Sequence, residues 1–447
     1  MSFEWLTTSV ADIAAPQAVA LATGPFGSSI GSKHFLEAGV PVIRGSNLSA
    51  DVSTRLIDDG LVFVSQEKAS EFQRSVARRG DLVFTCWGTI NQVGYIDEKA
   101  RYDTYIVSNK QMKLTVDPKK VDPRFLYYVF SGPEKQSEIL DNGIGSSVPG
   151  FNLGQLKRHD LLLPPLHEQR TIADALGTLD DRITLLRETN ATLEAIAQAL
   201  FKSWFVDFDP VRAKMEGRVP EGMDEDTAAL FPDGFEESEL GMVPRAWPVQ
   251  SFRDTINIIG GGTPRTSVDA YWGGDIPWFS VVDAPAHSDV FVVDTEKHIT
   301  EAGLNGSSTK LLPAGTTIIS ARGTVGRLAL TGRPMAMNQS CYGLRGKAGD
   351  DYFTYFRTTR LVEQLKQRAH GSVFDTITQE SFAGVLVSLP SNSAIAAFDD
   401  CVGALMLRTR ENLLQIQTLA TLRDTLLPRL ISGALRLPEA DAMQDNA

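Results

Sequence analysis

The sequence contains few cysteines and no long apolar run, and both shortages exclude whole classes of protein. Three of its 447 residues are cysteine, and no two of them form a CxxC pair. An odd number of scattered thiols argues against a disulfide framework and against a zinc cluster. No stretch reaches the roughly 18 apolar residues of a membrane span. Because Met1 to Val10 also lacks the basic start and apolar run of a signal peptide, we expect a cytoplasmic protein without a membrane contact.

Catalytic motifs are missing as well. There is no HExxH, no GxSxG and no Walker loop, and the glycines between Thr23 and Lys33 lack the preceding strand and the GK[ST] ending of a phosphate loop. The six histidines are scattered at positions 34, 159, 167, 287, 298 and 370. We predict no catalytic residue, no metal site and no bound cofactor on this chain.

The net charge of −12 is unevenly distributed along the chain. Residues 206–245 alone carry −7, whereas residues 1–160 carry −1 and residues 246–392 carry 0. An acidic protein is not expected to bind nucleic acid, but each near-neutral segment can still carry a basic face. The charge therefore leaves a nucleic-acid partner open without indicating one.

Residues 166–205 carry the clearest structural signal. Apolar residues alternate at spacings of four and three, which is typical of the heptad seam of a coiled-coil helix. Asn190 is the polar exception, and it either sets the register of helix pairing or leaves a partly exposed gap. The seam consists of Ile172, Leu176, Leu179, Ile183, Leu186, Asn190, Leu193, Ala197, Leu200 and Trp204.

The partner helix is predicted within the same chain, because the sequence repeats after 226 residues. Leu163-Pro164 returns as Leu389-Pro390, and the Gly-Ser pair at 145–146 returns at 371–372. The second seam is weaker, and Pro428 predicts a kinked or frayed last turn. It consists of Phe398, Val402, Leu405, Thr409, Asn412, Ile416, Leu419, Arg423, Leu426 and Leu430. Internal repeats of this kind allow the two helices to pair antiparallel.

The fold class is therefore α+β, with two α/β domains separated by two long antiparallel coiled-coil helices in an internal two-fold pseudo-repeat. Short apolar runs at 40–43, 61–64, 81–84 and 93–96 predict strands, and residues 123–140 predict a helix. The acidic segment with four prolines is expected to be a linker. The boundaries are 1–165 for the first domain, 166–208 for the first helix, 209–245 for the linker, 246–390 for the second domain, 391–435 for the second helix and 436–447 for the tail.

Matched polar loops in the two domains are the candidate contact residues. Arg suits guanine, Asn and Gln suit adenine, and hydroxyls suit either base or phosphate, although solvated loops have the same composition. The candidates of the first domain are Ser28, Arg44, Trp87, Thr89, Asn91, Asn109 and Lys110. Those of the second domain are Thr263, Arg265, Arg322, Thr324, Arg327, Asn338, Gln339, Ser340 and Ser372, where Met337–Ser340 aligns with Ser108–Gln111. We favour base reading for Arg322 and phosphate contact for Arg327.

Three aromatic residues, Trp204, Phe205 and Phe208, lie at the end of the first helix. Such a cluster either packs against the helix end or forms an apolar docking patch for another protein.

Several motifs, in this order and partly twice, resemble the DNA specificity subunit of type I restriction-modification systems. They are LPPLHEQRTIADALGTLDDRI from Leu163, WFVDFDPVRAK from Trp204, GGTP from Gly261, ARGTVG from Ala321, MNQS from Met337 and LLPRLISG from Leu426. The chain departs from the family at Ser391–Val402, where SNSAIAAFDDCV replaces a proline-rich, Gln-containing entry to the second helix. This departure leaves the start of that helix open.

The resemblance implies two target-recognition domains that each bind one half of a bipartite site in double-stranded DNA. It also implies two modification subunits, which supply the methyltransferase activity and bind S-adenosylmethionine, and a restriction subunit. One alternative is a coiled-coil adaptor that binds only proteins. Another is an enzyme in its own right, which the absence of an NPPY-like methyltransferase motif disfavours.

Overall fold

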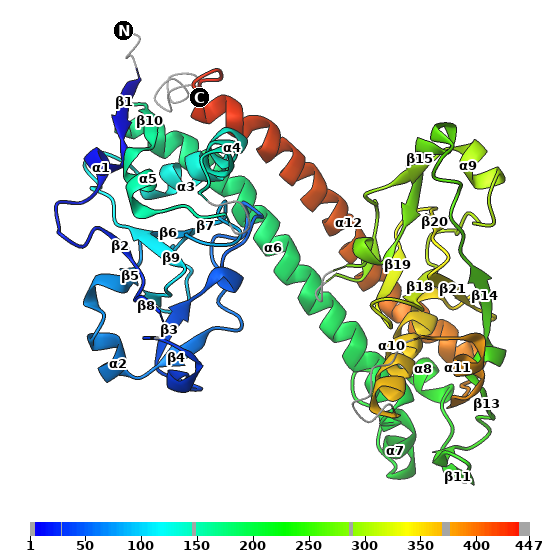
Figure 1. Cartoon of the computed structure of the whole chain (residues 1–447). Coiled ribbons are helices and arrows are strands. Elements are labelled where there is room, and N and C mark those ends of the chain that lie inside the picture. The colour runs from blue at the N-terminus through cyan, green and yellow to red at the C-terminus, as the bar shows by residue number, and fades with distance from the viewer. Residues whose placement is uncertain (1–4, 28, 145–148, 286–288, 369–375, 438–447) are drawn as a thin grey trace, which may run out of the picture. The chain divides into compact units, whose positions relative to one another are not determined.

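Two compact units make up the chain, which we describe from a computed structural model. One comprises Met1–Leu185 with Gln417–Ala447, and the other comprises Leu186–Ile416. Each holds one α/β domain and one part of each long helix (Figure 1). The structure describes residues 5–27, 29–144, 149–285, 289–368 and 376–437.

The first unit contains two four-stranded sheets, of order β2-β9-β6-β7 and β4-β3-β8-β5. The strands are β2 (Leu21–Thr23), β3 (Val40–Ile43), β4 (Val62–Val64), β5 (Val76–Arg78), β6 (Leu82–Thr85), β7 (Val93–Tyr95), β8 (Thr104–Val107) and β9 (Gln111–Leu114). Strands β3 and β8 are parallel, and all other neighbours are antiparallel. The four runs predicted as strands are therefore strands, with boundaries that shift by no more than one residue.

Helix α3 (Pro123–Ser131) packs on the first sheet and supplies much of its core. It begins at a proline, and the Asp122 carboxylate accepts hydrogen bonds from the first free N–H groups, which is a common helix start. Phe125 to Phe130 are all buried, and the Phe130 and Phe84 rings lie 4.9 Å apart. The other α-helices and strands of this unit outside the long helices are α1 (Val10–Ile13), α2 (Gln66–Ser70), α4 (Pro133–Asp141), α5 (Leu153–Arg158) and the strand pair β1 (Leu6–Ser9) and β10 (Asp160–Leu163).

The second unit repeats this plan, which confirms the predicted pseudo-repeat. Its larger sheet has the order β14-β21-β18-β19-β16, and its smaller sheet has the order β17-β15-β20 with β15 and β20 parallel. The strands are β13 (Val249–Ser251), β14 (Ile256–Gly260), β15 (Trp272–Phe279), β16 (Phe291–Val292), β17 (His298–Ile299), β18 (Thr317–Ser320), β19 (Leu328–Thr331), β20 (Ala336–Met337), β21 (Cys341–Gly346) and β22 (Leu386–Ser388). Three helices accompany them, α9 (Glu301–Asn305), α10 (Asp351–Arg368) and α11 (Gln379–Ala383).

The acidic segment between the first helix and the second domain is folded, which corrects the picture of a plain linker. It forms α7 (Asp209–Met215), α8 (Glu225–Ala229) and a hairpin of β11 (Phe235–Ser238) and β12 (Gly241–Pro244). Its apolar side chains Val211 and Phe231 are buried in the same core as Trp204 and Phe205. Its charged residues lie outside this core, so the net charge did not reveal the packing.

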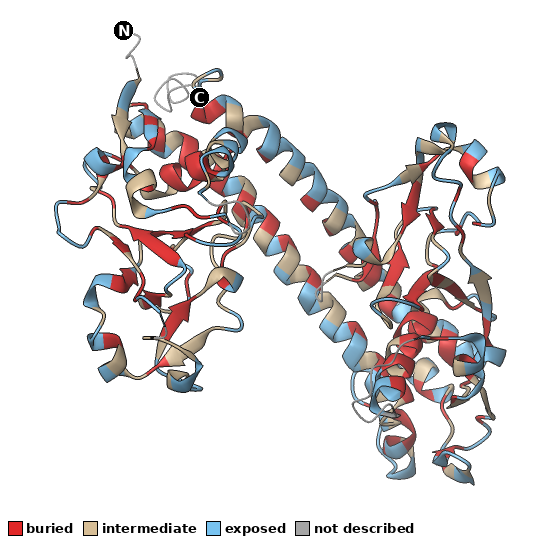
Figure 2. Cartoon of the chain, in the orientation of Figure 1, coloured by how far each residue is buried: buried red, intermediate tan, exposed pale blue. Residues whose placement is uncertain are grey.

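The two long helices are α6 (Leu166–Phe205) and α12 (Asn392–Ile431). Every predicted seam residue is buried or half-buried, and buried residues follow one side of each helix into the domain cores (Figure 2). In the first unit Ile172 and Leu176 pack with Leu427 and Leu430, so the helices run antiparallel. In the second unit Phe201, near the C-terminal end of α6, packs on Phe398, near the N-terminal end of α12, with ring centroids 5.7 Å apart. This contact also requires antiparallel helices.

Local interactions determine where α12 begins and where it ends. The Ser391 hydroxyl accepts a hydrogen bond from the Ala394 N–H, which makes Ser391 the cap that starts the helix. Pro428 lies within the last turn, and the helix ends three residues later at Ile431. Gly433 then adopts a φ of 75°, the left-handed conformation that commonly follows a helix end.

The polar seam residue Asn190 is paired, so it is not an exposed gap. Its side-chain amide donates to the Thr409 carbonyl at 3.2 Å, and its side-chain oxygen accepts from the Asn412 amide at 2.8 Å. Asn190 and Asn412 are each 1% exposed. Of the three polar residues that weaken the second seam, Asn412 thus bonds to Asn190 through its side chain and Thr409 through its main-chain carbonyl.

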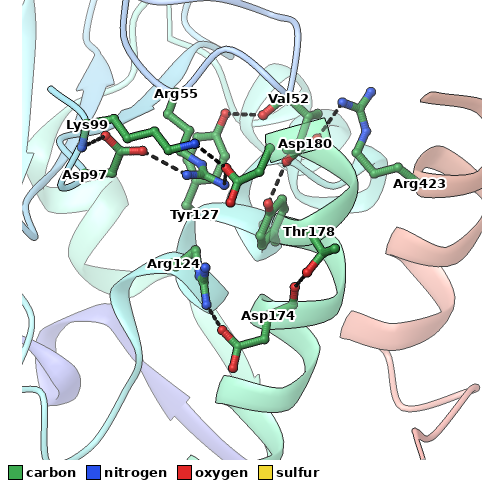
Figure 3. A network of polar contacts seen from close by, with 12 residues as sticks. Val52, Arg55, Asp97, Lys99, Arg124, Tyr127, Asp174, Thr178, Asp180 and Arg423 are labelled. Carbon is green, nitrogen blue, oxygen red and sulfur yellow. Dashed lines mark hydrogen bonds and ion pairs between the residues drawn. The ribbon is translucent and has the colours of Figure 1, made fainter. Parts of the chain in front are cut away.

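The third polar residue, Arg423, belongs to a buried network in the first unit (Figure 3). Its guanidinium binds the Asp180 carboxylate at 2.9 Å, and this carboxylate also accepts a hydrogen bond from the Tyr128 hydroxyl at 2.6 Å. Burial raises the pKa of Asp180, while Tyr128 and Arg423 oppose that shift. The network ties α6 and α12 to helix α3 of the first domain.

Each domain has a helix that follows its larger sheet, α3 in the first domain and α10 in the second. These two helices are attached to the long helices by different hydrogen bonds. In the first, the Gln169 side chain of α6 accepts from the Asp122 N–H at 2.9 Å and donates to the Pro164 carbonyl at 2.8 Å. Its counterpart after 226 residues is the apolar Ile395. In the second, the Asp399 carboxylate accepts from the first N–H groups of α10, Tyr352 at 3.2 Å and Phe353 at 2.7 Å.

We expect the Asp180–Arg423 pair to be replaceable only as a whole. The equivalent positions of the second unit hold Met406 and Ala197, which are both fully buried. Asp180→Ala removes the buried partner of the guanidinium, which keeps only the exposed Asp424 carboxylate at 2.8 Å, and also removes the acceptor of the Tyr128 hydroxyl. It should lower the free energy of unfolding of the first unit by about 2–4 kcal/mol. The combination Asp180→Met, Arg423→Ala and Tyr128→Phe should recover most of that loss, as measured by urea denaturation. A combined variant no more stable than the single one would contradict this account.

We also expect Asp399 to make stability depend on pH. Burial raises its pKa to about 7, with help from the Asp350 and Asp351 carboxylates and against the two N–H donors. The folded state therefore binds a proton that the unfolded state releases near pH 4, and stability falls as pH rises from about 4 to 7. Asp399→Asn removes this fall. The melting temperature of the variant minus that of the wild type should rise between pH 4 and 7 and level off above, and a constant difference would contradict the assignment.

Candidate nucleic-acid interface

In the first domain, four loops meet at one end of the sheet formed by β2, β9, β6 and β7. The Gly24 N–H donates to the Gln111 carbonyl at 3.0 Å, the Cys86 N–H to the Lys110 carbonyl at 2.6 Å and the Phe151 N–H to the Cys86 carbonyl at 2.8 Å. These main-chain bonds join the loop after β2, the loop after β6, the turn between β8 and β9 and the segment before α5.

Two of these three bonds recur in the second domain. The Ala321 N–H donates to the Ser340 carbonyl at 2.7 Å, and the Ile377 N–H donates to the Ala321 carbonyl at 2.9 Å. Close packing recurs as well, because a Cβ on Gly24 would lie 1.9 Å from the Ser108 carbonyl oxygen and a Cβ on Gly261 would lie 1.9 Å from that of Asn338. Only glycine allows this approach of two loops.

These bonds correct one detail of the expected alignment. They place Asn338 at the position of Ser108 and Ser340 at that of Lys110, so the two turns are shifted by one residue from the pairing predicted by sequence. Side-chain similarity between the Asn and Gln residues suggested the wrong register, because it is the main chain that the two turns share.

Most of the predicted contact residues lie on these loops. Exposed are Trp87, Thr89, Asn109, Lys110, Thr263, Arg265, Arg322, Thr324 and Gln339, whereas Arg44, Asn91, Arg327, Asn338 and Ser340 are half-buried. Ser28 and Ser372 lie outside the described residues, as do the Gly-Ser pairs at 145–146 and 371–372. The exposed members are free to meet a ligand from solvent.

Two predicted arginines are used within the protein instead. The Arg327 guanidinium donates to the carbonyls of Pro285 at 2.6 Å and Ala284 at 3.3 Å. The Arg44 guanidinium donates to the Gly60 carbonyl at 3.0 Å and lies over the Phe35 ring. Arg327 therefore stabilises a neighbouring loop, which argues against the phosphate contact expected for it.

The predicted amides also hold the loops together. The Asn109 side chain donates to the Gly27 carbonyl at 3.1 Å, and the Thr263 hydroxyl donates to the Gln339 side chain at the equivalent place in the second domain. The Asn338 side-chain oxygen accepts from the Ser340 N–H at 3.0 Å. Each amide keeps its remaining groups for another partner.

The aromatic cluster at the end of α6 belongs to the core and does not form a docking surface. Trp204 and Phe205 are 7% and 9% exposed, and both rings pack on Phe398 of α12. Phe208 is half-buried and packs on Trp247. This outcome excludes an exposed patch built from Trp204 and Phe205.

Sequence reasoning missed Phe26, which is 84% exposed at the tip of the first loop. The prediction for this stretch considered only its glycines, and a single large apolar residue among glycines and serines was the available signal. Phe26 has the position of Thr263 in the second domain, since each follows its close-packed glycine by two residues.

Two buried cysteines lie beside these loops, Cys86 in the first domain and Cys341 in the second. Burial raises the pKa of the Cys86 and Cys341 thiols to about 12, so neither is a thiolate nucleophile at neutral pH. Among the described residues, no group of three or more His, Cys, Asp or Glu side chains could hold a metal ion. None of the described helices is long and apolar enough to cross a bilayer.

Arg322 and Arg327 provide a matched test of these roles. Arg327→Ala removes two charged hydrogen bonds and should lower the free energy of unfolding by about 1.5–3 kcal/mol. The exposed Arg322 should be replaceable by Ala without a measurable change in melting temperature. Equal melting temperatures for both variants would contradict the role given to Arg327.

The chain is similar in sequence to a known protein family and to individual members of it. A sequence profile described as the type I restriction modification DNA specificity domain matches residues 34–195 and 244–398. The specificity subunit of the type I restriction enzyme HindI from Haemophilus influenzae is 29% identical over 377 residues, which cover 74% of this chain and 82% of the relative. The putative MjaX specificity subunit from Methanocaldococcus jannaschii is 21% identical over 81% of each chain.

A solved structure agrees in fold. The crystal structure of the type I restriction-modification S subunit from M. genitalium superimposes with a TM-score of 0.55 at 14% identity, covering 95% of this chain and 96% of that one. Since the family profile matches both α/β domains and more than half of the residues, this chain belongs to the type I restriction modification DNA specificity family, and its two domains are target-recognition domains.

Proposed function

We propose that each domain binds one half of a bipartite site in double-stranded DNA through the loops that converge at the end of its larger sheet. The observation that carries this proposal is the recurrence of one main-chain hydrogen-bond scheme in both domains, at Cys86 and Phe151 and again at Ala321 and Ile377. A shared scaffold with different exposed side chains suits two recognition surfaces of common origin and different sequence preference.

The proposal assigns residues 1–165 and 246–390 to DNA recognition and residues 166–208 and 391–435 to the helix pair that sets the distance between half-sites. Two helices of 40 residues, each joined to a domain core, are rigid enough for that role. The folded segment 209–245 then connects helix and domain, and 436–447 is a tail. The complex is expected in the cytoplasm, where the DNA lies.

We further propose that the chain is not itself an enzyme. Two modification subunits would supply methyl transfer and bind S-adenosylmethionine, and a restriction subunit would supply cleavage. The pseudo-repeat supports two equivalent docking positions, because each domain packs on residues of both α6 and α12 in the same way.

The proposal is tested by mapping methylated adenines in cells that express this chain with its modification subunits. We expect a bipartite motif that disappears when the chain is omitted. Exchanging residues 246–390 for those of a relative should change one half of the motif and leave the other half and the spacer unchanged. If both halves changed, the domains would not recognise DNA independently, and the assignment of one half-site to each would be wrong.

A further inference from the structure

One backbone position carries an aromatic side chain in the first domain and a charged side chain in the second. Trp87 follows Cys86, and Arg322 follows Ala321, the two residues whose hydrogen bonds are shared. Each forms an isolated antiparallel bridge, Trp87 with Gly150 and Arg322 with Thr376. Each is followed by a glycine in the left-handed region, with φ of 92° at 88 and 77° at 323. The two side chains therefore start from equivalent places and directions.

Both side chains are open to solvent. Trp87 is 50% exposed, and Arg322 is exposed, with no side-chain hydrogen bond or ion pair to any part of the chain that the structure describes. The indole of tryptophan is among the largest apolar side-chain groups, and an exposed one commonly marks a contact surface. An exposed arginine at the equivalent position of the other domain, without a side-chain partner among the described residues, is suited to a ligand that offers hydrogen-bond acceptors.

The Trp87 ring is held in place by the main chain of Gly150. A Cβ at that glycine would lie 2.6 Å from Cζ3 of the indole, so any larger residue would displace the ring. Ile144, which is 50% exposed, exchanges two main-chain hydrogen bonds of 2.8 Å with Gly150 and extends the apolar surface. Phe26 extends the apolar character of these loops, whereas its counterpart in the second domain is the polar Thr263.

The base edges in the major groove of DNA also include both polar and apolar groups. Guanine presents two acceptors, O6 and N7, that match an arginine fork, and thymine presents a C5-methyl group that accepts only apolar contact. A ring that rests against backbone offers a flat surface to a methyl group and is poorly placed to enter between stacked bases.

We propose that Trp87 packs against the C5-methyl group of a thymine in the half-site of the first domain, and that Arg322 pairs with a guanine in the half-site of the second. This inference rests on the proposed function. It assigns the first half-site to apolar recognition and the second to hydrogen bonding at one shared position of the fold.

The test uses the complex of the full chain with its modification subunits and synthetic duplexes that contain the mapped motif. Replacing a thymine of the first half-site by deoxyuridine removes one methyl group and should weaken binding about fourfold at the contacted position. Replacing a guanine of the second half-site by 7-deazaguanine removes N7 and should weaken binding on the order of tenfold.

The variants show which residue makes each contact. Trp87→Ala should bind thymine and deoxyuridine duplexes equally while keeping its response to 7-deazaguanine, and Arg322→Ala should behave in the opposite way. Trp87→Phe keeps an apolar ring and should keep part of the response to deoxyuridine, which separates loss of the contact from loss of folding. Melting temperatures of all three variants provide a further control.

A deoxyuridine response that persists in Trp87→Ala, or a first half-site without a specified A·T pair, would overturn the thymine assignment. A 7-deazaguanine response that persists in Arg322→Ala would overturn the guanine assignment. Failure of the proposed function has a different signature, because the wild-type complex would then methylate no bipartite motif at all.

Discussion

The antiparallel contact between α6 and α12 is the interaction on which the rest of the structure depends. The helices are part of each domain's hydrophobic core, since Ile172 and Leu430 lie in one core and Phe201 and Phe398 in the other. Removing the helix pair would expose an apolar face of both domains to water, and burial of such faces is the main source of folding free energy. Helix pairing and domain folding are therefore one cooperative event in each unit.

Much of this fold could be predicted from the sequence, because its strongest signals are periodic. The seam of α6, the 226-residue repeat and the strands of the first domain depend on alternating apolar residues, which local pattern reveals directly. The partners of buried polar residues were beyond the sequence, because they depend on which turn of one helix faces which turn of the other. Asn190 is the clear case, since its bonds to Thr409 and Asn412 decide between two interpretations that local pattern left open.

The candidate site was predictable in place but not in detail. Loop composition identified the exposed Trp87 and Arg322, yet it also assigned Arg327 to a phosphate contact, whereas the Arg327 guanidinium donates to two carbonyls of another loop. The loops are joined mainly by main-chain bonds, and these do not depend on side-chain identity. The scaffold can therefore keep its geometry while the exposed residues change, which is the property that a family of recognition domains needs.

The polar pairs Asn190–Asn412 and Asp180–Arg423 also favour pairing of α6 with α12 over pairing of α6 with a second copy of itself. Under the 226-residue repeat, the partner positions of Asn190 and Asp180 on a second copy of α6 are Leu186 and Ala197 instead of Asn412 and Arg423. A symmetric assembly of two identical first halves would thus bury an amide and a carboxylate against apolar side chains, at a cost of several kcal/mol. The same two contacts that join the helices therefore favour pairing between the two unlike halves of this chain over pairing between two like halves.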